Sequence, residues 1–356
     1  MQPKSFDKIE ERKKNNNFRS LQINTNYIDF YSNDYLGISK QLTHLKSSHS
    51  GSTGSRLISG NSVEAEKCEK FLADFFETEG ALVFNSGYDA NLGLFSCIAG
   101  RNDTIIYDEL VHASIRDGIR LSISNSFSFK HNNLESLIQK LELAKGDVFL
   151  AIESLYSMDG DFAPIAEIIA LKKKYNFYLI VDEAHACGIL GEKGRGLSFE
   201  FNASIFAKIV TFGKAYGAHG ATVLGSKELI RYLVNFARSF IYTTAMPSSQ
   251  YSTIVESIEY SLNKKNKDHL FKNIEYFVSR NKAKLLLQNP LSPIQIIQFG
   301  TKEELQQLSE NLLTNNFAVK LIVSPTVPIN SERIRICIHA FNTIDEIENI
   351  SKLLQF

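Results

Sequence analysis

Net charge is the first property that this sequence lacks. Its 356 residues carry 39 Lys+Arg and 39 Asp+Glu, so the formal net charge is zero. A protein that binds nucleic acid through a broad basic surface is therefore excluded. Long apolar runs are lacking as well, because runs such as residues 177–181 have the length of a strand. A membrane helix needs ~20 residues, so we expect no membrane span.

Cysteine clusters are also missing, and we expect no signal peptide. Residues 1–18 are polar and mixed in charge, without the apolar stretch of a signal peptide. Cysteine is scarce, with no C-x-x-C pair and four residues far apart: Cys68, Cys97, Cys187 and Cys337. Scattered thiols favour neither a disulfide framework nor a thiolate metal site. We therefore expect a cytoplasmic protein without bound metal and without nucleic-acid or membrane partners.

Short apolar runs and helical patterns alternate from about residue 60 onward. Apolar residues at helical spacing occupy residues 63–75 and 134–141. Between and after them lie strand-sized runs at residues 81–84, 104–107, 148–152, 178–181 and 208–212. Continuous apolar strands that alternate with helices are typical of an α/β fold whose mostly parallel central sheet has helices on both faces.

A change of texture after residue 246 indicates a second domain. A helical stretch and a lysine-rich segment lead into strands and helices that mix up to residue 356. We expect an N-terminal segment at residues 1–45, a large domain with the parallel sheet at 46–245, and a smaller C-terminal α+β domain at 246–356. The length also favours about two domains.

Two residues at predicted strand ends point to one kind of chemistry. Asp182 follows a buried run and Lys214 follows another, and ligands of an open parallel sheet bind beyond these ends. Taken alone, Asp182 could cap the next helix and Lys214 could be a surface lysine in a turn. Together they match pyridoxal 5′-phosphate, which joins a lysine as a Schiff base and needs a carboxylate at its pyridinium nitrogen.

The same cofactor needs a phosphate site and a ring contact. The segment 86–88 (Ser-Gly-Tyr) lies between a strand and a helix, where backbone N–H groups bind phosphate and glycine permits close approach. His112 follows another strand end and is a candidate to stack on the ring, although a lone histidine is more often structural.

The motifs of two other functional classes are absent or incomplete in this sequence. Residues 182–185 spell the DEAH tetrad of a helicase, but no G-x-x-x-x-G-K-[ST] loop precedes them. No G-x-S-x-G follows a strand, which excludes an α/β hydrolase of the usual kind.

The chain resembles the α-oxoamine synthases, which are fold-type I pyridoxal-phosphate transferases. The resemblance extends over about residues 32–356. It rests on seven collinear motifs: SNDYLG at 32–37, GSTGSR at 51–56 with SG at 59–60, HAS at 112–114, SMDGD at 157–161, VDEAH at 181–185, TFGK at 211–214 and PTVP at 325–328.

This resemblance implies roles for the cofactor residues. Lys214 would hold the cofactor as an imine and move the α-proton of the amino acid. Asp182 would pair with the pyridinium nitrogen, His185 would bond the phenolic oxygen, and His112 would stack on the ring. Further residues implied to hold cofactor oxygens are Gly87, Tyr88, Ser157, Thr211 and Thr244, the last lent by a partner subunit.

The resemblance also implies substrates. Arg335 would bind the carboxylate of the amino acid, and the other implied substrate contacts are Arg19, Asn33 and Thr326. The reaction would be the decarboxylative condensation of L-alanine with a pimeloyl thioester of coenzyme A or acyl carrier protein, in a homodimer with shared active sites. Glycine with an acetyl thioester is the alternative within the family. One departure is Asn342, which stands where the family's Ala-x-His-Thr has histidine.

Overall fold

The computed structural model describes residues 12–15, 27–41, 51–298, 300–324 and 326–355. They form two compact units. One is Asn33–Leu270, and the other combines Met1–Ser32 with Phe271–Phe356. Within the described ranges, no helix is both long enough and apolar enough to cross a membrane.

A seven-stranded sheet forms the centre of the larger unit, in the order β2-β8-β7-β6-β5-β3-β4. Its neighbouring strands are parallel, except that β8 runs antiparallel to both β2 and β7. The predicted mostly parallel sheet is therefore confirmed. The strands are β2 (Gly80–Phe84), β3 (Thr104–Asp108), β4 (Asn125–Phe129), β5 (Val148–Glu153), β6 (Tyr178–Asp182), β7 (Ile205–Thr211) and β8 (Ala221–Gly225).

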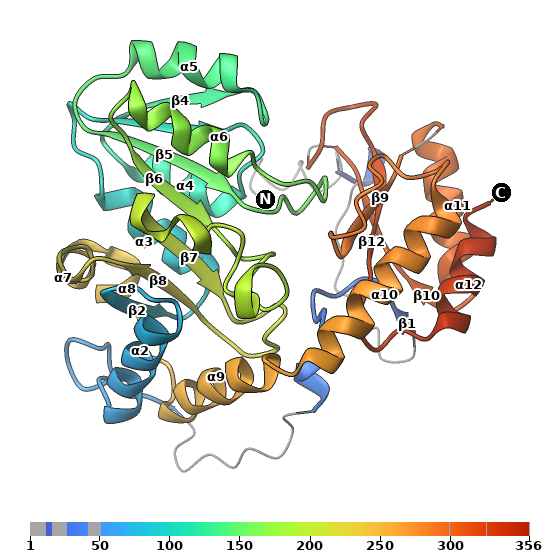
Figure 1. The fold of residues 1–356 in the computed structure, drawn as a ribbon, viewed down its shortest axis with the longest axis horizontal. Coiled ribbons are helices and arrows are strands. Elements are labelled where there is room, and N and C mark those ends of the chain that lie inside the picture. Colours follow the sequence, from blue (N-terminus) through green and yellow to red (C-terminus); the bar gives the residue numbers. More distant parts are fainter. Residues whose placement is uncertain (1–11, 16–26, 42–50, 299, 325, 356) are drawn as a thin grey trace, which may run out of the picture. The chain divides into compact units, whose positions relative to one another are not determined.

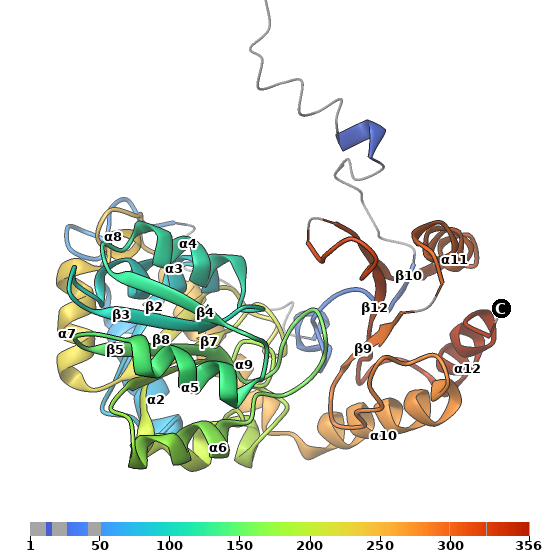
Figure 2. The same cartoon turned by 90° about the horizontal axis from the view of Figure 1, so that it is seen from above.

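Helices cover both faces of this sheet, as Figures 1 and 2 show. Alternate residues of β5 divide between the two cores, with Ala151 facing one and Leu150 facing the other. One face carries α3 (Gly87–Cys97), α4 (Ala113–Leu121), α7 (Lys227–Phe236) and α8 (Arg238–Ile241). The other carries α2 (Val63–Phe75), α5 (Leu134–Leu143), α6 (Ile165–Ala170) and α9 (Ser248–Ser261). Short 3-10 turns complete this unit: η2 (Ile38–Lys40), η3 (Leu171–Lys173), η4 (Glu192–Gly194) and η5 (Phe199–Ser204).

Polar side chains begin most of these helices. Ser62, Ser86 and Asn133 each accept a backbone N–H of the helix that follows. Such caps satisfy N–H groups that have no partner inside the helix. The cap of α4 is unusual because it is His112, whose ring accepts the N–H of Ser114. This role places the imidazole at the carboxyl edge of the sheet.

The smaller unit has its own sheets. Strands β11 (Lys320–Ile322), β12 (Arg333–Cys337) and β9 (Ile294–Ile297) form an antiparallel sheet in that order. A short parallel pair joins β1 (Ile28–Asp29) to β10 (Phe317–Ala318). The helices are α11 (Lys302–Thr314), α12 (Ile344–Leu353) and α10 (Lys264–Asn281), within which the division between the units falls. The predicted smaller α+β part is confirmed.

The boundaries between the two units lie at 32/33 and 270/271, whereas we predict boundaries at 45/46 and 245/246. Helix α9 belongs to the larger unit because its Ile254 and Ile258 share a core with Leu72 of α2. Strand β1 belongs to the smaller unit because it pairs with β10. Most of the predicted N-terminal segment lies outside the described residues.

Asn342, the departure from the family pattern, closes a corner of the smaller unit. Its Oδ1 accepts the backbone N–H of His339 at 2.8 Å, and its Nδ2 donates to the carbonyl of Asp29 at 3.1 Å. The amide therefore serves as both acceptor and donor at this corner.

Candidate active site

A cavity of about 280 Å³ lies in the larger unit, beyond the carboxyl ends of β5, β6 and β7. This is where an open parallel sheet binds its ligands. Among its lining residues are most of those that the sequence predicts: Asn33, Gly87, Tyr88, His112, Asp182, His185, Thr211 and Lys214. The fold thus brings together side chains that are far apart along the chain.

Asp182 ends strand β6 and is 5% exposed. Its Oδ1 accepts the backbone N–H of Ala184 at 3.0 Å, and its Oδ2 accepts Nδ2 of Asn91 at 2.8 Å. The residues after Asp182 form turns rather than a helix, so the carboxylate does not cap a helix there. It is a fixed hydrogen-bond acceptor in the cavity wall.

His112 lies between Ser114 and Glu153. Its Nδ1 is 2.7 Å from Ser114 Oγ, and its backbone N–H donates to Glu153 Oε1 at 2.6 Å. Burial lowers the pKa of His112, and the nearby Lys214 lowers it further, against the opposing effect of Asp182. The imidazole is therefore neutral near pH 7.

Glu153 is a cavity residue without a predicted role. It ends β5 directly beside Asp182 of β6. Burial, with the nearby charge of Asp182, raises its pKa to about 8. A carboxyl group of this kind is mostly protonated at neutral pH, so Glu153 adds no full second negative charge beside Asp182.

Lys214 lies in a tight turn after β7 and is followed by two buried residues. Ala215 and Tyr216 are buried, and the backbone N–H of Gly217 donates to the carbonyl of Lys214 at 2.8 Å. The turn therefore holds the half-buried lysine at the cavity edge.

His185 contacts Tyr35, which lies far from it in the sequence. The hydroxyl of Tyr35 is 2.9 Å from His185 Nδ1 and donates to Asn33 Oδ1 at 3.2 Å. Tyr35 belongs to the motif at residues 32–37, but the motif by itself does not predict the contact with His185.

The start of α3 offers backbone donors to the cavity. The cap Ser86 accepts the N–H of Asp89 at 3.0 Å, whereas the first N–H groups of a helix have no partner within it. A Cβ on Gly87 would lie 2.5 Å from Thr211 Cγ2, so a larger residue at this position would require one of the two residues to move. The start of α3, packed closely against Thr211, therefore forms a backbone cradle of the kind that binds phosphate.

The other predicted site residues lie elsewhere. Ser157 is half-buried in the turn after β5, and Thr244 is exposed, with its carbonyl accepting Asn85 Nδ2 at 2.9 Å. Arg335, buried in β12, and the exposed Thr326 belong to the smaller unit. Arg19 lies outside the described residues.

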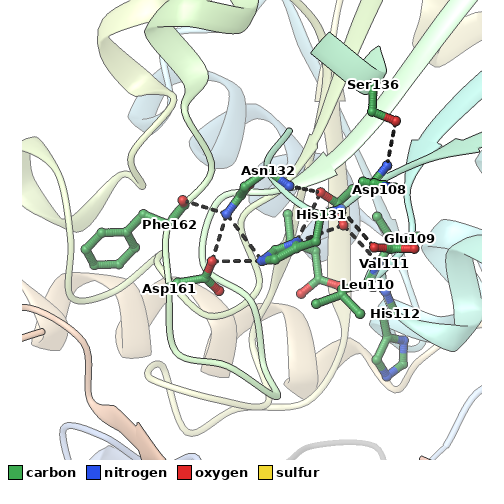
Figure 3. A network of polar contacts seen from close by, with 12 residues as sticks. Asp108, Glu109, Leu110, Val111, His112, His131, Asn132, Ser136, Asp161 and Phe162 are labelled. Carbon is green, nitrogen blue, oxygen red and sulfur yellow. Dashed lines mark hydrogen bonds and ion pairs between the residues drawn. The ribbon is translucent and has the colours of Figure 1, made fainter. Parts of the chain in front are cut away.

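A charged network around His131 was not foreseen from the sequence (Figure 3). His131, after β4, lies with Nδ1 3.0 Å from Asp108 Oδ1 and Nε2 2.8 Å from Asp161 Oδ2. Burial lowers the pKa of His131, but hydrogen bonds to the two carboxylates outweigh it and raise the pKa to about 10. Asp108 also accepts the N–H of Leu110 at 2.8 Å, so the network fixes the loop that leads to His112.

Comparisons with known proteins show a family and several relatives that this chain resembles over most of its length. Residues 25–354 match the family described as aminotransferase class I and II. The chain is 36% identical over 337 residues to the 8-amino-7-oxononanoate synthase of Lysinibacillus sphaericus, covering 91% of this chain and 87% of the relative.

Solved structures are similar over almost the same length. The crystal structure of 8-amino-7-oxononanoate synthase from Francisella tularensis has 30% sequence identity and a TM-score of 0.79, covering 92% of this chain and 96% of that chain. A serine palmitoyltransferase from S. paucimobilis, solved with a bound PLP–myriocin aldimine, has 28% identity and a TM-score of 0.86, covering 92% and 86%.

Proposed function

Because the chain belongs to the aminotransferase class I and II family, within it to the α-oxoamine synthases, we propose that it joins L-alanine to a pimeloyl thioester. The products are 8-amino-7-oxononanoate, CO2 and the free thiol, as in biotin biosynthesis. The observation that carries this choice is the 36% identity to an 8-amino-7-oxononanoate synthase over 91% of the chain.

Pyridoxal 5′-phosphate is the cofactor, and the cavity residues fit it. The backbone cradle at Gly87 suits the phosphate, and the fixed carboxylate of Asp182 suits a protonated ring nitrogen. When bound, the cofactor withdraws electrons from the Cα of an attached amino acid, so that its bonds to hydrogen and to the carboxylate can break.

Each residue then has a distinct task. Lys214 attaches the cofactor and carries the Cα proton, His112 contacts the ring, and His185 bonds the phenolic oxygen. Thr211 borders the cradle. The neutral form of Glu153 leaves Asp182 as the principal anion beside the ring, which favours a cationic nitrogen.

Substrate residues complete the proposal. Arg335 binds the carboxylate of L-alanine, for which a guanidinium offers paired donors. Thr326 and Arg19 contact the acyl substrate, Asn33 is a further substrate contact, and Ser157 contributes to cofactor binding. The enzyme acts as a homodimer in which Thr244 reaches the partner's phosphate site, and its acyl donor is a thioester of coenzyme A or acyl carrier protein.

A matrix of substrates tests the reaction. Purified protein loaded with the cofactor is offered L-alanine, glycine or L-serine with pimeloyl, acetyl, succinyl or long-chain thioesters. Release of thiol and product mass are measured. L-alanine with the pimeloyl thioester is expected to give the highest kcat/KM. Preference for glycine with acetyl, or for L-serine with a long-chain thioester, would reject the proposed substrates in favour of another α-oxoamine synthase activity.

A further inference from the structure

Asn91 lines the cavity beside Asp182. It lies on α3, one turn after Gly87, and is 2% exposed. Its Nδ2 donates to Asp182 Oδ2 at 2.8 Å and to Ser114 Oγ at 3.1 Å. Both amide hydrogens are thereby used, one on the carboxylate and one on the hydroxyl.

The hydrogen bonds at Ser114 have a defined direction. Its backbone N–H can only donate, and it lies 3.2 Å from His112 Nδ1, so this ring nitrogen is an acceptor. The Ser114 hydroxyl is 2.7 Å from the same nitrogen and therefore donates its hydrogen to it. The hydroxyl oxygen then accepts from Asn91. The proton of the neutral His112 ring consequently lies on Nε2.

Asn91 thus connects the two residues proposed to contact the cofactor ring. Asp182 comes from strand β6 and His112 from the start of α4, and the asparagine on α3 donates toward both. We propose that Asn91 is a positioning residue that holds Asp182 toward the cofactor's ring nitrogen and, through Ser114, holds His112 as the Nε2–H tautomer. This inference rests on the proposed function.

No common replacement of similar size does the same. Leucine has no donor, and aspartate would place a second carboxylate against Asp182. A hydrogen bond to a charged group contributes enough that its loss changes an equilibrium about 10- to 100-fold. We therefore expect N91L and N91D to weaken cofactor binding by about that factor. The pH at which the absorbance of the bound cofactor changes should also shift.

Asn281 provides a matched control. It is 3% exposed, and its Nδ2 likewise donates twice, to the carbonyl of Phe277 and to Ser351 Oγ, each at 2.8 Å. Its Oδ1, like that of Asn91, is buried without a hydrogen-bond partner among the described residues. Asn281 lies in the smaller unit, outside the cavity. N281L should lower Tm while leaving cofactor affinity unchanged.

The experiment compares the wild type with N91L, N91D, S114A and N281L. Cofactor affinity is measured by absorbance titration, the pH titration of the bound cofactor is recorded, and Tm is measured without cofactor. S114A keeps the bond from Asn91 to Asp182, so it should shift the pH titration with a smaller loss of affinity than N91D. If N91L does not fold, N91D and S114A still decide the question.

Two results would overturn the positioning role. One is wild-type affinity and an unchanged pH titration in N91D and S114A. The other is an equal loss of affinity in N91L and N281L, which would assign the effect to general destabilisation. Failure of the wild type itself to bind pyridoxal 5′-phosphate would instead reject the proposed function, so the two failures are distinguishable.

Discussion

Glu153 and Asp182 lie directly opposite each other on the parallel strands β5 and β6, and both side chains line the cavity. Two carboxyl groups that neighbour each other in a buried site do not both ionise readily. Burial and the charge of Asp182 raise the pKa of Glu153 to about 8. The pair therefore holds a proton at neutral pH that a single carboxylate would not.

The first prediction concerns the pH dependence of stability. The folded pKa of Glu153, about 8, is above its usual value of 4.5, so the folded state binds the extra proton between these values. Its contribution to stability is fully present below the unfolded pKa and is lost as pH rises through about 8. E153Q should remove this loss, because glutamine does not titrate. Urea unfolding of the cofactor-free wild type and E153Q from pH 5 to pH 9 or so measures the free energy of unfolding. Equal slopes of this free energy against pH in the two proteins would contradict the prediction.

Lys214→Ala should abolish covalent attachment of the cofactor. After treatment with borohydride, the wild type should gain the mass of a reduced pyridoxal-phosphate adduct on the peptide containing Lys214. The variant should gain none and should have no measurable turnover. Lys227→Ala, at an exposed lysine that begins α7, serves as control and should behave as the wild type. An adduct on another lysine of the K214A variant would show that Lys214 is wrongly assigned.

Gly87→Ala should weaken cofactor binding, because its Cβ would lie 2.5 Å from Thr211 Cγ2 and one of the two residues must move. Thr211→Ser removes that methyl group and keeps the hydroxyl. The double variant should therefore recover much of the affinity that G87A loses. Absorbance titration with pyridoxal 5′-phosphate gives the three affinities, and additive losses in the double variant would rule out the steric explanation.

His131→Gln should destabilise the larger unit by about 3 kcal/mol near pH 7, because Asp108 would remain buried without its cationic partner. The pKa of His131 is raised to about 10 in the folded state from 6.5. Its stabilising effect is fully present below about 6.5 and is lost as pH rises through about 10. Urea unfolding at several pH values tests this, with the exposed His269→Gln as control. A difference between wild type and H131Q that does not shrink at high pH would count against it.

The parts of the fold that were predicted share a simple pattern. Strands β5 and β6 are covered on both faces, so each is a continuous apolar run that can be recognised without other information. Strand β4 was not predicted because it lies at the sheet edge and alternates polar with aromatic residues. Strand β8 was not predicted because it departs from the alternation of strands and helices: the loop 212–220, rather than a helix, joins it to β7, and it runs antiparallel.

For the site, the sequence by itself determined which reactive side chains follow the strands. Asp182 and Lys214 could be found because the carboxyl ends of parallel strands meet at one edge of the sheet, wherever the helices pack. The tertiary structure alone decided what surrounds them. Asn91 reaches Ser114 because α3 and α4 pack closely at Gly118, where a Cβ would lie 2.8 Å from Phe95 Cβ. Contacts of this kind depend on how closely two helices pack. The spacing of residues within either helix does not specify the distance between the helices.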